Sequence, residues 1–204
     1  MNELTVGAIV GNGMKQGMKN LGSISVNVIL YILTIWIPYL NVGTSIGLTV
    51  GLVAKSGRGE PISPTEIFDP RYRKQMGDYF LASGLVSVGT SVAFALLVIP
   101  GIVLALAWSL ATLLTVDKGM NPTAAITESN NRTYGQKWTI FFGTLVLGIV
   151  VAVVAGAFAL IGTSISEPIG AILAIIGVAL SLSVVICGNG YIYETLAGDI
   201  ADEA

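Results

Sequence analysis

The side chains that most often carry out chemistry are scarce in this sequence of 204 residues. It contains no histidine and a single cysteine, Cys187, which lies in an apolar run. Without imidazole groups the chain lacks the commonest general base and the usual zinc ligand, and one cysteine cannot form an intramolecular disulfide. We expect Cys187 to be an inert, buried thiol.

Carboxylates are the remaining candidates for acid–base or metal chemistry. They pair as Glu66 with Asp69 and as Asp117 with Glu128, in polar segments where helix capping and surface charge account for them. The sequence shows no nucleophile–base grouping, no phosphate-binding Gly-Lys-Ser/Thr motif and no dinucleotide fingerprint. It therefore predicts a non-enzymatic protein with no catalytic residue, no metal site and no cofactor.

Uncharged polar side chains form a repeat inside an apolar stretch instead. Ser83, Ser87 and Ser91 recur every four residues. Their hydroxyls therefore share one helix face, where they either line a polar pathway for a neutral solute or bond to neighbouring carbonyl groups. Asn27, also in an apolar stretch, is expected to make a hydrogen bond between helices.

Two stripes of small residues have the same spacing as the serines. They are Gly43, Gly47 and Gly51 in one segment and Gly148, Ala152 and Gly156 in another. Small side chains allow two helix backbones to approach closely. Each stripe therefore predicts either helix packing inside the chain or an interface between copies.

The composition indicates that a membrane surrounds these repeats. Hydrophobic residues make up 53% of the chain and charged residues 11%, against about 25% charged in soluble domains. The net charge of −2 provides no basic surface for nucleic acid. Charge is absent from residues 20–54, 79–116, 138–166 and 168–193, and a membrane span needs only about 20 apolar residues. The sequence therefore predicts an all-α, polytopic integral membrane protein.

Prolines divide the uncharged stretches into helices of membrane length. Pro38 and Pro100 interrupt the first two stretches, because proline breaks a helix interior, and the last two stretches hold one helix each. We therefore predict one membrane domain over residues 1–204, built as a bundle of six transmembrane helices. The predicted passes are residues 21–37, 40–54, 79–98, 101–116, 138–162 and 168–193.

Basic residues orient this bundle. With six passes, all ten lysines and arginines fall in the N-terminal segment or in the loops 55–78 and 117–137. The positive-inside rule then places both loops and both termini in the cytoplasm. A first hairpin that dips into the bilayer and returns would leave this orientation unchanged.

Short helices are predicted in the cytoplasmic segments. Residues 1–20 have the pattern of an amphipathic helix at the membrane interface, although their glycines also suit close packing on a transmembrane helix. Ser63-Pro64-Thr65-Glu66 predicts a capping box that starts a short helix, and Asn121-Pro122 predicts a helix over 122–134. Lipid headgroups are expected to contact the basic side chains of Lys15, Lys19, Arg71, Arg73, Lys74 and Lys137.

An ordered set of short motifs is shared with a known family. The motifs are Gly59-Glu60-Pro61, Ile99-Pro100-Gly101, Trp108-Ser109-Leu110, Asp117-Lys118-Gly119 and Gln136-Lys137-Trp138. Over most of its length the chain resembles the uncharacterised bacterial integral membrane family called domain of unknown function 975. That family is similar to the membrane domain attached to some glycerophosphoryl diester phosphodiesterases, whose catalytic barrel this chain lacks. The resemblance implies a six-helix domain of the bacterial cytoplasmic membrane with no established activity.

These observations favour a structural or interaction module. We expect it to associate with copies of itself or with other membrane-protein subunits, to contact membrane lipids and to bind no nucleic acid. A passive channel or carrier for a small neutral solute is the second hypothesis, suggested by the serine repeat. Lipid handling at the cytoplasmic leaflet is the third, suggested by the N-terminal segment and the basic residues.

Overall fold

The computed structural model describes residues 4–201, and all the regular elements of this part of the chain are helical. The prediction of an all-α chain is therefore confirmed. In chain order the elements are α1 (Val6–Lys19), α2 (Leu21–Thr34), α3 (Leu40–Ile46), the π-helical turn η1 (Gly47–Gly51), α4 (Leu52–Gly57), the 3₁₀ turn η2 (Glu66–Phe68), α5 (Pro70–Lys74), α6 (Met76–Leu96), α7 (Val98–Ala107), α8 (Ala111–Asp117), α9 (Pro122–Thr133), α10 (Lys137–Thr163) and α11 (Glu167–Ala197).

Four stretches of helix are long and apolar enough to cross a membrane. They are α6, α7 together with α8, α10 and α11, of 21, 20, 27 and 31 residues. At 1.5 Å per residue these helices measure about 30–46 Å, which matches or exceeds a hydrocarbon core of about 30 Å. The last four predicted passes therefore correspond to helices that a bilayer can accommodate.

Large apolar side chains on these four helices face outward. Val88 of α6 and Val153 of α10 are both 65% exposed, and Leu160 near the tip of α10 is 74% exposed. Soluble monomers rarely expose contiguous apolar surface of this kind, whereas lipid tails are as apolar as these side chains. The outward faces therefore indicate a membrane protein.

The first apolar stretch forms shorter helices. α2 has 14 residues, about 21 Å of helix, and ends at Thr34 before the predicted limit at residue 37. A turn around Tyr39, whose φ is 69°, leads into α3, η1 and α4, which follow one another from Leu40 to Gly57. α2 is thus too short for a straight crossing of a bilayer of ordinary thickness.

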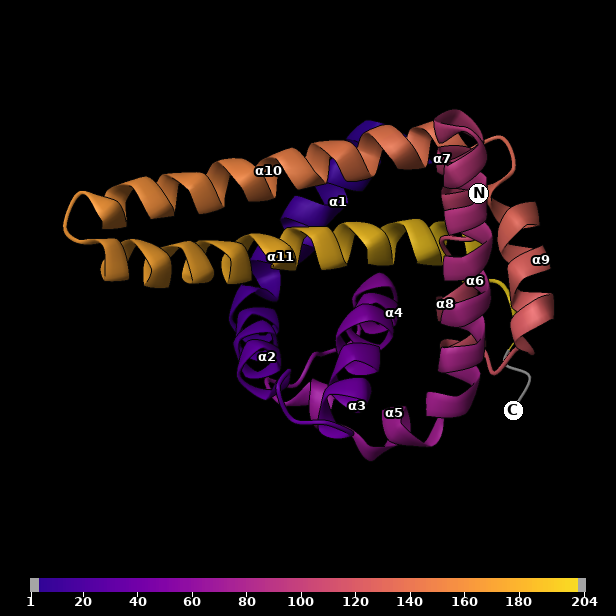
Figure 1. Ribbon diagram of the computed structural model, residues 1–204, viewed down its shortest axis with the longest axis horizontal. Coiled ribbons are helices and arrows are strands. Elements are labelled where there is room, and N and C mark those ends of the chain that lie inside the picture. The colour runs from indigo at the N-terminus through magenta and orange to yellow at the C-terminus, as the bar shows by residue number, and fades with distance from the viewer. Residues whose placement is uncertain (1–3, 202–204) are drawn as a thin grey trace.

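The long helices form two apolar pairs that run in different directions. Figure 1 shows α10 and α11 as a hairpin that extends away from the other helices, while α6 runs across that direction at the other end of the molecule. α6 packs against α7, and α10 packs along α11. Transmembrane helices tilt by about 20° on average, so both pairs do not stand upright in one bilayer in this arrangement.

The buried core surrounds the C-terminal half of α11, which contacts α1, α2 and α4. Glycines allow this close approach. A Cβ atom on Gly17 of α1 would lie 2.8 Å from the Cα of Val184 in α11, and one on Gly190 of α11 would lie 2.6 Å from the carbonyl oxygen of Val53 in α4. α1 therefore follows the second of its two predicted modes, close packing on a long helix. Its predicted apolar face is partly outward, with Met18 68% exposed.

The loop after α4 corrects two predictions. Ser63 does not cap a helix with Glu66; the turn at Ser63–Thr65 leads into η2, and Asp69 caps α5 by accepting a hydrogen bond from the Arg71 amide at 2.9 Å. Asn27 does not bond to another long helix. Its amide donates to the Ser63 carbonyl at 2.7 Å and accepts from the Ile67 amide at 3.0 Å, so it fastens the loop to α2. Satisfying the loop backbone was the stronger demand, because buried backbone groups need partners.

The predicted start of the helix after Asn121 is confirmed. The Asn121 side chain accepts a hydrogen bond from the Thr123 amide at 3.1 Å, and Pro122 occupies the first turn of α9. This placement positions Ser129 and Thr133 against the break between α7 and α8. There the Ser129 hydroxyl donates to the Ala107 carbonyl at 2.7 Å and accepts from the Leu110 amide at 3.1 Å.

Candidate functional site

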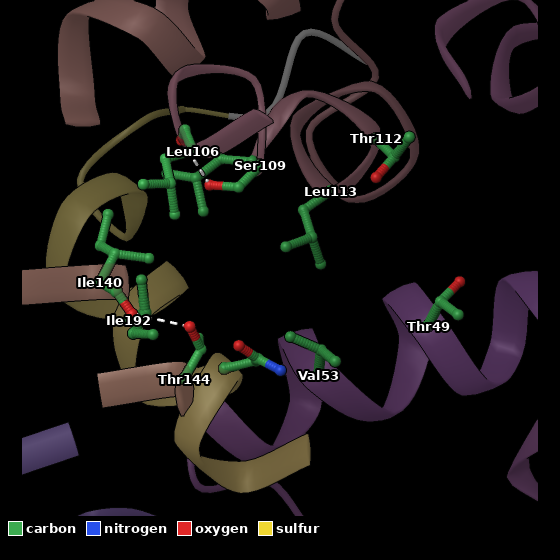
Figure 2. Close-up of a pocket in the computed structure, with 11 residues that line it drawn as sticks. Thr49, Val53, Leu106, Ser109, Thr112, Leu113, Ile140, Thr144 and Ile192 are labelled. Atoms are coloured by element: carbon green, nitrogen blue, oxygen red, sulfur yellow. Dashed lines mark hydrogen bonds between the residues drawn. The ribbon is translucent and has the colours of Figure 1, made fainter. Parts of the chain in front are cut away.

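Two cavities lie along the contact between η1–α4 and the α7–α8 segment. The larger, which we call the hydroxyl-lined cavity, has a volume of about 330 Å³. Figure 2 shows labelled residues of four helical segments arranged around it. Its lining consists of Thr49, Val53, Leu106, Ser109, Leu110, Thr112, Leu113, Ile140, Thr144, Asn189 and Ile192.

The helix break at Trp108–Leu110 shapes one wall of this cavity. α7 ends at Ala107 and α8 begins at Ala111, so Ser109 lies in the intervening turn and lines the cavity. The hydrogen bonds from Ser129 of α9 hold that turn in place. The opposite wall comes from α10 and α11, which contribute Thr144 and Asn189.

Hydroxyl groups in the lining have already committed their hydrogen atoms. Thr49, Ser109 and Thr144 each donate to a main-chain carbonyl of their own segment, at 2.8, 2.9 and 2.8 Å. A hydroxyl oxygen has one donor and two acceptor positions. The cavity therefore presents hydrogen-bond acceptors in excess of donors, without a formal charge.

Asn189 was missed by the reasoning from sequence. Its half-buried side chain lines the cavity, and its amide makes no hydrogen bond to another described residue. The signal was present, since Asn189 is an amide within the uncharged stretch 168–193 and stands between two glycines. Polar side chains inside apolar helices usually find a partner or serve a function.

The smaller cavity, of about 160 Å³, lies among ion pairs where α4, α5 and α8 meet. We call it the ion-paired cavity. Its lining comprises Val50, Gly51, Lys55, Arg58, Arg71, Tyr72, Gln75, Val116 and Asp117. The three basic side chains each pair with a carboxylate, so the cavity carries little net charge.

Asp117 joins three helix ends beside the ion-paired cavity. It accepts hydrogen bonds from Nη1 of Arg58, after α4, at 2.8 and 2.9 Å, and from the hydroxyl of Tyr193, near the end of α11, at 2.8 Å. Burial acts to lower the pKa of Arg58, but the hydrogen bonds and charges of Asp117 and Glu60 outweigh it and raise the pKa above its usual value. Arg58 is therefore permanently charged, as a fixed partner of Asp117 must be.

Glu66 organises the opposite side of this cavity. Its carboxylate lies 2.8 Å from the Lys55 ammonium and accepts a hydrogen bond from the Tyr72 hydroxyl at 3.0 Å. Burial, together with the adjacent charge of Glu66, raises the pKa of Tyr72, so the phenol remains protonated and donates. A carboxylate this buried is stable because both partners are present.

The structure corrects the predicted pathway along Ser83, Ser87 and Ser91. These residues line neither cavity. They lie on α6, whose surface is almost wholly uncovered, and Ser83 donates to the Phe80 carbonyl at 3.3 Å. A stripe on one uncovered helix has no opposite wall, so it encloses no pathway within a single chain.

The two stripes of small residues differ in what they face. Gly43, Gly47 and Gly51 are buried against Arg73, Ile67 and Tyr72 of the same chain, which agrees with packing inside the molecule. Gly148, Ala152 and Gly156 are exposed, and a Cβ atom on either glycine would meet nothing within 4 Å. The second stripe therefore faces outward, where it forms part of a shallow groove on α10.

The basic residues expected at lipid headgroups fall into two groups. Lys15, Lys19 and Lys74 are exposed. The other three are engaged within the chain, because Arg71 pairs with Asp69, Arg73 covers Gly43 and the Lys137 ammonium donates to Asn130 at 3.2 Å.

Comparisons with known proteins identify no relative, since no family model, curated protein or solved structure matches this chain.

Proposed function

We propose that the chain crosses the bacterial cytoplasmic membrane six times, with both termini and the loops 55–78 and 117–137 in the cytoplasm. The resemblance to the domain-of-unknown-function family implies the same architecture. On this proposal α4, α8 and α11 each end an inward crossing, and α2 spans by local thinning of the bilayer. The α6–α7 and α10–α11 pairs then lie closer to parallel in the membrane than in Figure 1.

The contacts of Asp117 support this topology. Arg58, Asp117 and Tyr193 follow or close the second, fourth and sixth predicted passes, and they are hydrogen-bonded to one another. Three helix ends in contact must share one side of the bilayer. A miscount by one pass between any two of them would separate these side chains by the hydrocarbon core of about 30 Å.

Cysteine labelling tests the topology. In a Cys187→Ser background, single cysteines are placed at Trp36, Ile99 and Ile165 in the outer turns and at Lys74 and Asn121 in the inner loops. A membrane-impermeant maleimide applied to intact cells should label the first three sites and should label the other two only after permeabilisation. Labelling of Lys74→Cys in intact cells, or protection of Ile99→Cys, would overturn the topology; protection of Trp36→Cys alone would show that the first hairpin is re-entrant.

We propose that the protein acts without catalysis, as a membrane module that associates with copies of itself. The outward stripe of α6 carries this proposal. Ser87 and Ser91 are exposed at membrane depth, where polar side chains normally face other helices rather than lipid. Gly148, Ala152 and Gly156 of α10 offer a second outward surface that allows close backbone approach.

Native mass spectrometry in lipid discs tests self-association. Interhelical hydrogen bonds in membranes contribute about 0.6 kcal/mol each, so Ser87→Leu with Ser91→Leu removes about 2.4 kcal/mol from a symmetric dimer and weakens it about 50-fold. Val92→Leu, on another side of α6, is the matched control and should leave the oligomer unchanged. A strictly monomeric wild-type protein, or an unchanged oligomer in the double-leucine variant, would refute the proposal.

A further inference from the structure

We propose that the hydroxyl-lined cavity binds a small uncharged molecule rich in hydroxyl groups, of the polyol class. This inference goes beyond self-association, because none of the outward-facing stripe residues of α6 and α10 lines the cavity. It also differs from a pathway along the α6 serines, since the site lies between α4, α8, α10 and α11.

The lining excludes an ionic ligand. None of the eleven lining residues carries a charge, and an ion moved from water into such a site would lose its hydration without gaining a charged partner. The nearest charges, at Arg58 and Asp117, belong to the ion-paired cavity and are hydrogen-bonded to each other. The ligand is therefore neutral.

The hydrogen-bonding pattern requires a ligand that brings donors. The hydroxyl hydrogens of Thr49, Ser109 and Thr144 are held by main-chain carbonyls at 2.8–2.9 Å, which leaves their oxygens as acceptors. Asn189 adds an amide with two donors and one acceptor and no partner among the described residues. An alcohol group satisfies both kinds of position, because it donates and accepts.

Size and apolar contacts limit the ligand further. Leu110, Ile140 and Ile192 are buried and provide apolar surface for the carbon backbone of the ligand. The volume of about 330 Å³ is at the lower end of the range of about 300–1,000 Å³ for small-molecule sites. A polyol of three to six carbons fits these limits. An acyl chain would fill the volume but would leave the acceptors and the Asn189 amide unpaired.

Saturation-transfer NMR on the wild-type protein in lipid discs tests the proposal without a mutation. The probes are glycerol and erythritol, and the matched control is 1,2,3-trimethoxypropane, which keeps the carbon chain and oxygens of glycerol but has no donor. Glycerol and erythritol should bind at least tenfold more tightly than the ether. Equal binding of the ether, or no binding of either polyol at millimolar concentration, would overturn the proposal.

Variants assign the binding to this cavity. Thr144→Val removes one acceptor with little change of shape, and Asn189→Ala removes the amide; because one hydrogen bond contributes about 0.5–1.5 kcal/mol, we expect polyol affinity to fall about 2–10-fold for each. Thr90→Val on α6 is the control, since the Thr90 hydroxyl also donates within its helix, to Val86 at 2.7 Å, but lies outside the cavity. Unchanged affinity in both cavity variants, or an equal loss in Thr90→Val, would refute the assignment.

Discussion

Three glycines of α1 allow one substitution to be compared in three environments. A Cβ atom on Gly11 would meet nothing within 4 Å, whereas on Gly13 it would lie 2.9 Å from the Val184 carbonyl oxygen. On Gly17 it would lie 2.8 Å from the Cα and 2.9 Å from the amide nitrogen of Val184. Alanine at these positions therefore probes whether α1 is docked on α11 through Gly13 and Gly17.

The expected effects have opposite signs. Gly→Ala in a helix interior is favourable by about 1 kcal/mol, so Gly11→Ala should stabilise the protein by about that amount. Gly17→Ala gains the same propensity but presses a methyl group into the backbone of α11, and overpacking of this kind costs about 1–3 kcal/mol. The propensity gain cancels between the two variants, so Gly17→Ala should be less stable than Gly11→Ala by about 1–3 kcal/mol, with Gly13→Ala between them.

Thermal unfolding of the purified variants in one detergent measures this order. For a chain of this size 1 kcal/mol corresponds to about 2–4 °C in Tm, so the two extreme variants should differ by about 2–12 °C. If α1 instead lies on the membrane surface away from α11, all three glycines are open and all three alanines stabilise alike. Equal Tm increases in the three variants would therefore refute the docked α1.

Three further predictions concern the polar segments. Tyr193→Phe should lower stability by about 1–3 kcal/mol, because Asp117 loses a buried donor; an unchanged Tm would contradict this role. Hydrogen bonds from Arg71 hold the pKa of Asp69 below its usual value, so its contribution, under about 1 kcal/mol at this exposed site, is complete above the unfolded-state pKa of about 3.9 and is lost as the pH falls through the lower folded pKa. Unfolding at pH 6 and pH 3 should show a smaller difference in Asp69→Asn than in wild type, and equal differences would argue against it. Lys15→Ala with Lys19→Ala should weaken retention of anionic lipid about 30-fold, at about 1 kcal/mol per exposed charge, whereas the bonded Lys137 should matter less; equal losses would contradict this distinction.

The helices of the membrane domain could be predicted because their signals are local. Proline, charge and apolar length act within a few residues, so the turns near Pro38 and Pro100 and the extents of α10 and α11 follow from the sequence. The cap at Asn121 is local for the same reason. These features require no knowledge of which segments meet in space.

The partners of each helix face could not be predicted, because they depend on contacts between distant segments. Gly47 and Gly148 have the same spacing pattern, yet only Gly47 is covered, and the residues that cover it, Ile67 and Tyr72, come from a loop. The capping box failed for a similar reason. Glu66 is drawn to Lys55 and Tyr72, and a buried ion pair outweighs a cap available in solvent.

The π-helical turn at Gly47–Gly51 has a consequence for how this chain can change in evolution. A π turn arises when one residue is inserted into an α-helix, and deleting one residue there would restore a regular helix. Such a deletion would turn everything after it by about 100° relative to α3. Lys55 would then leave Glu66, and Arg58 would leave Asp117. The length of this segment is consequently coupled to the two carboxylates, and lineages that lose the extra residue should also have replaced Glu66 and Asp117.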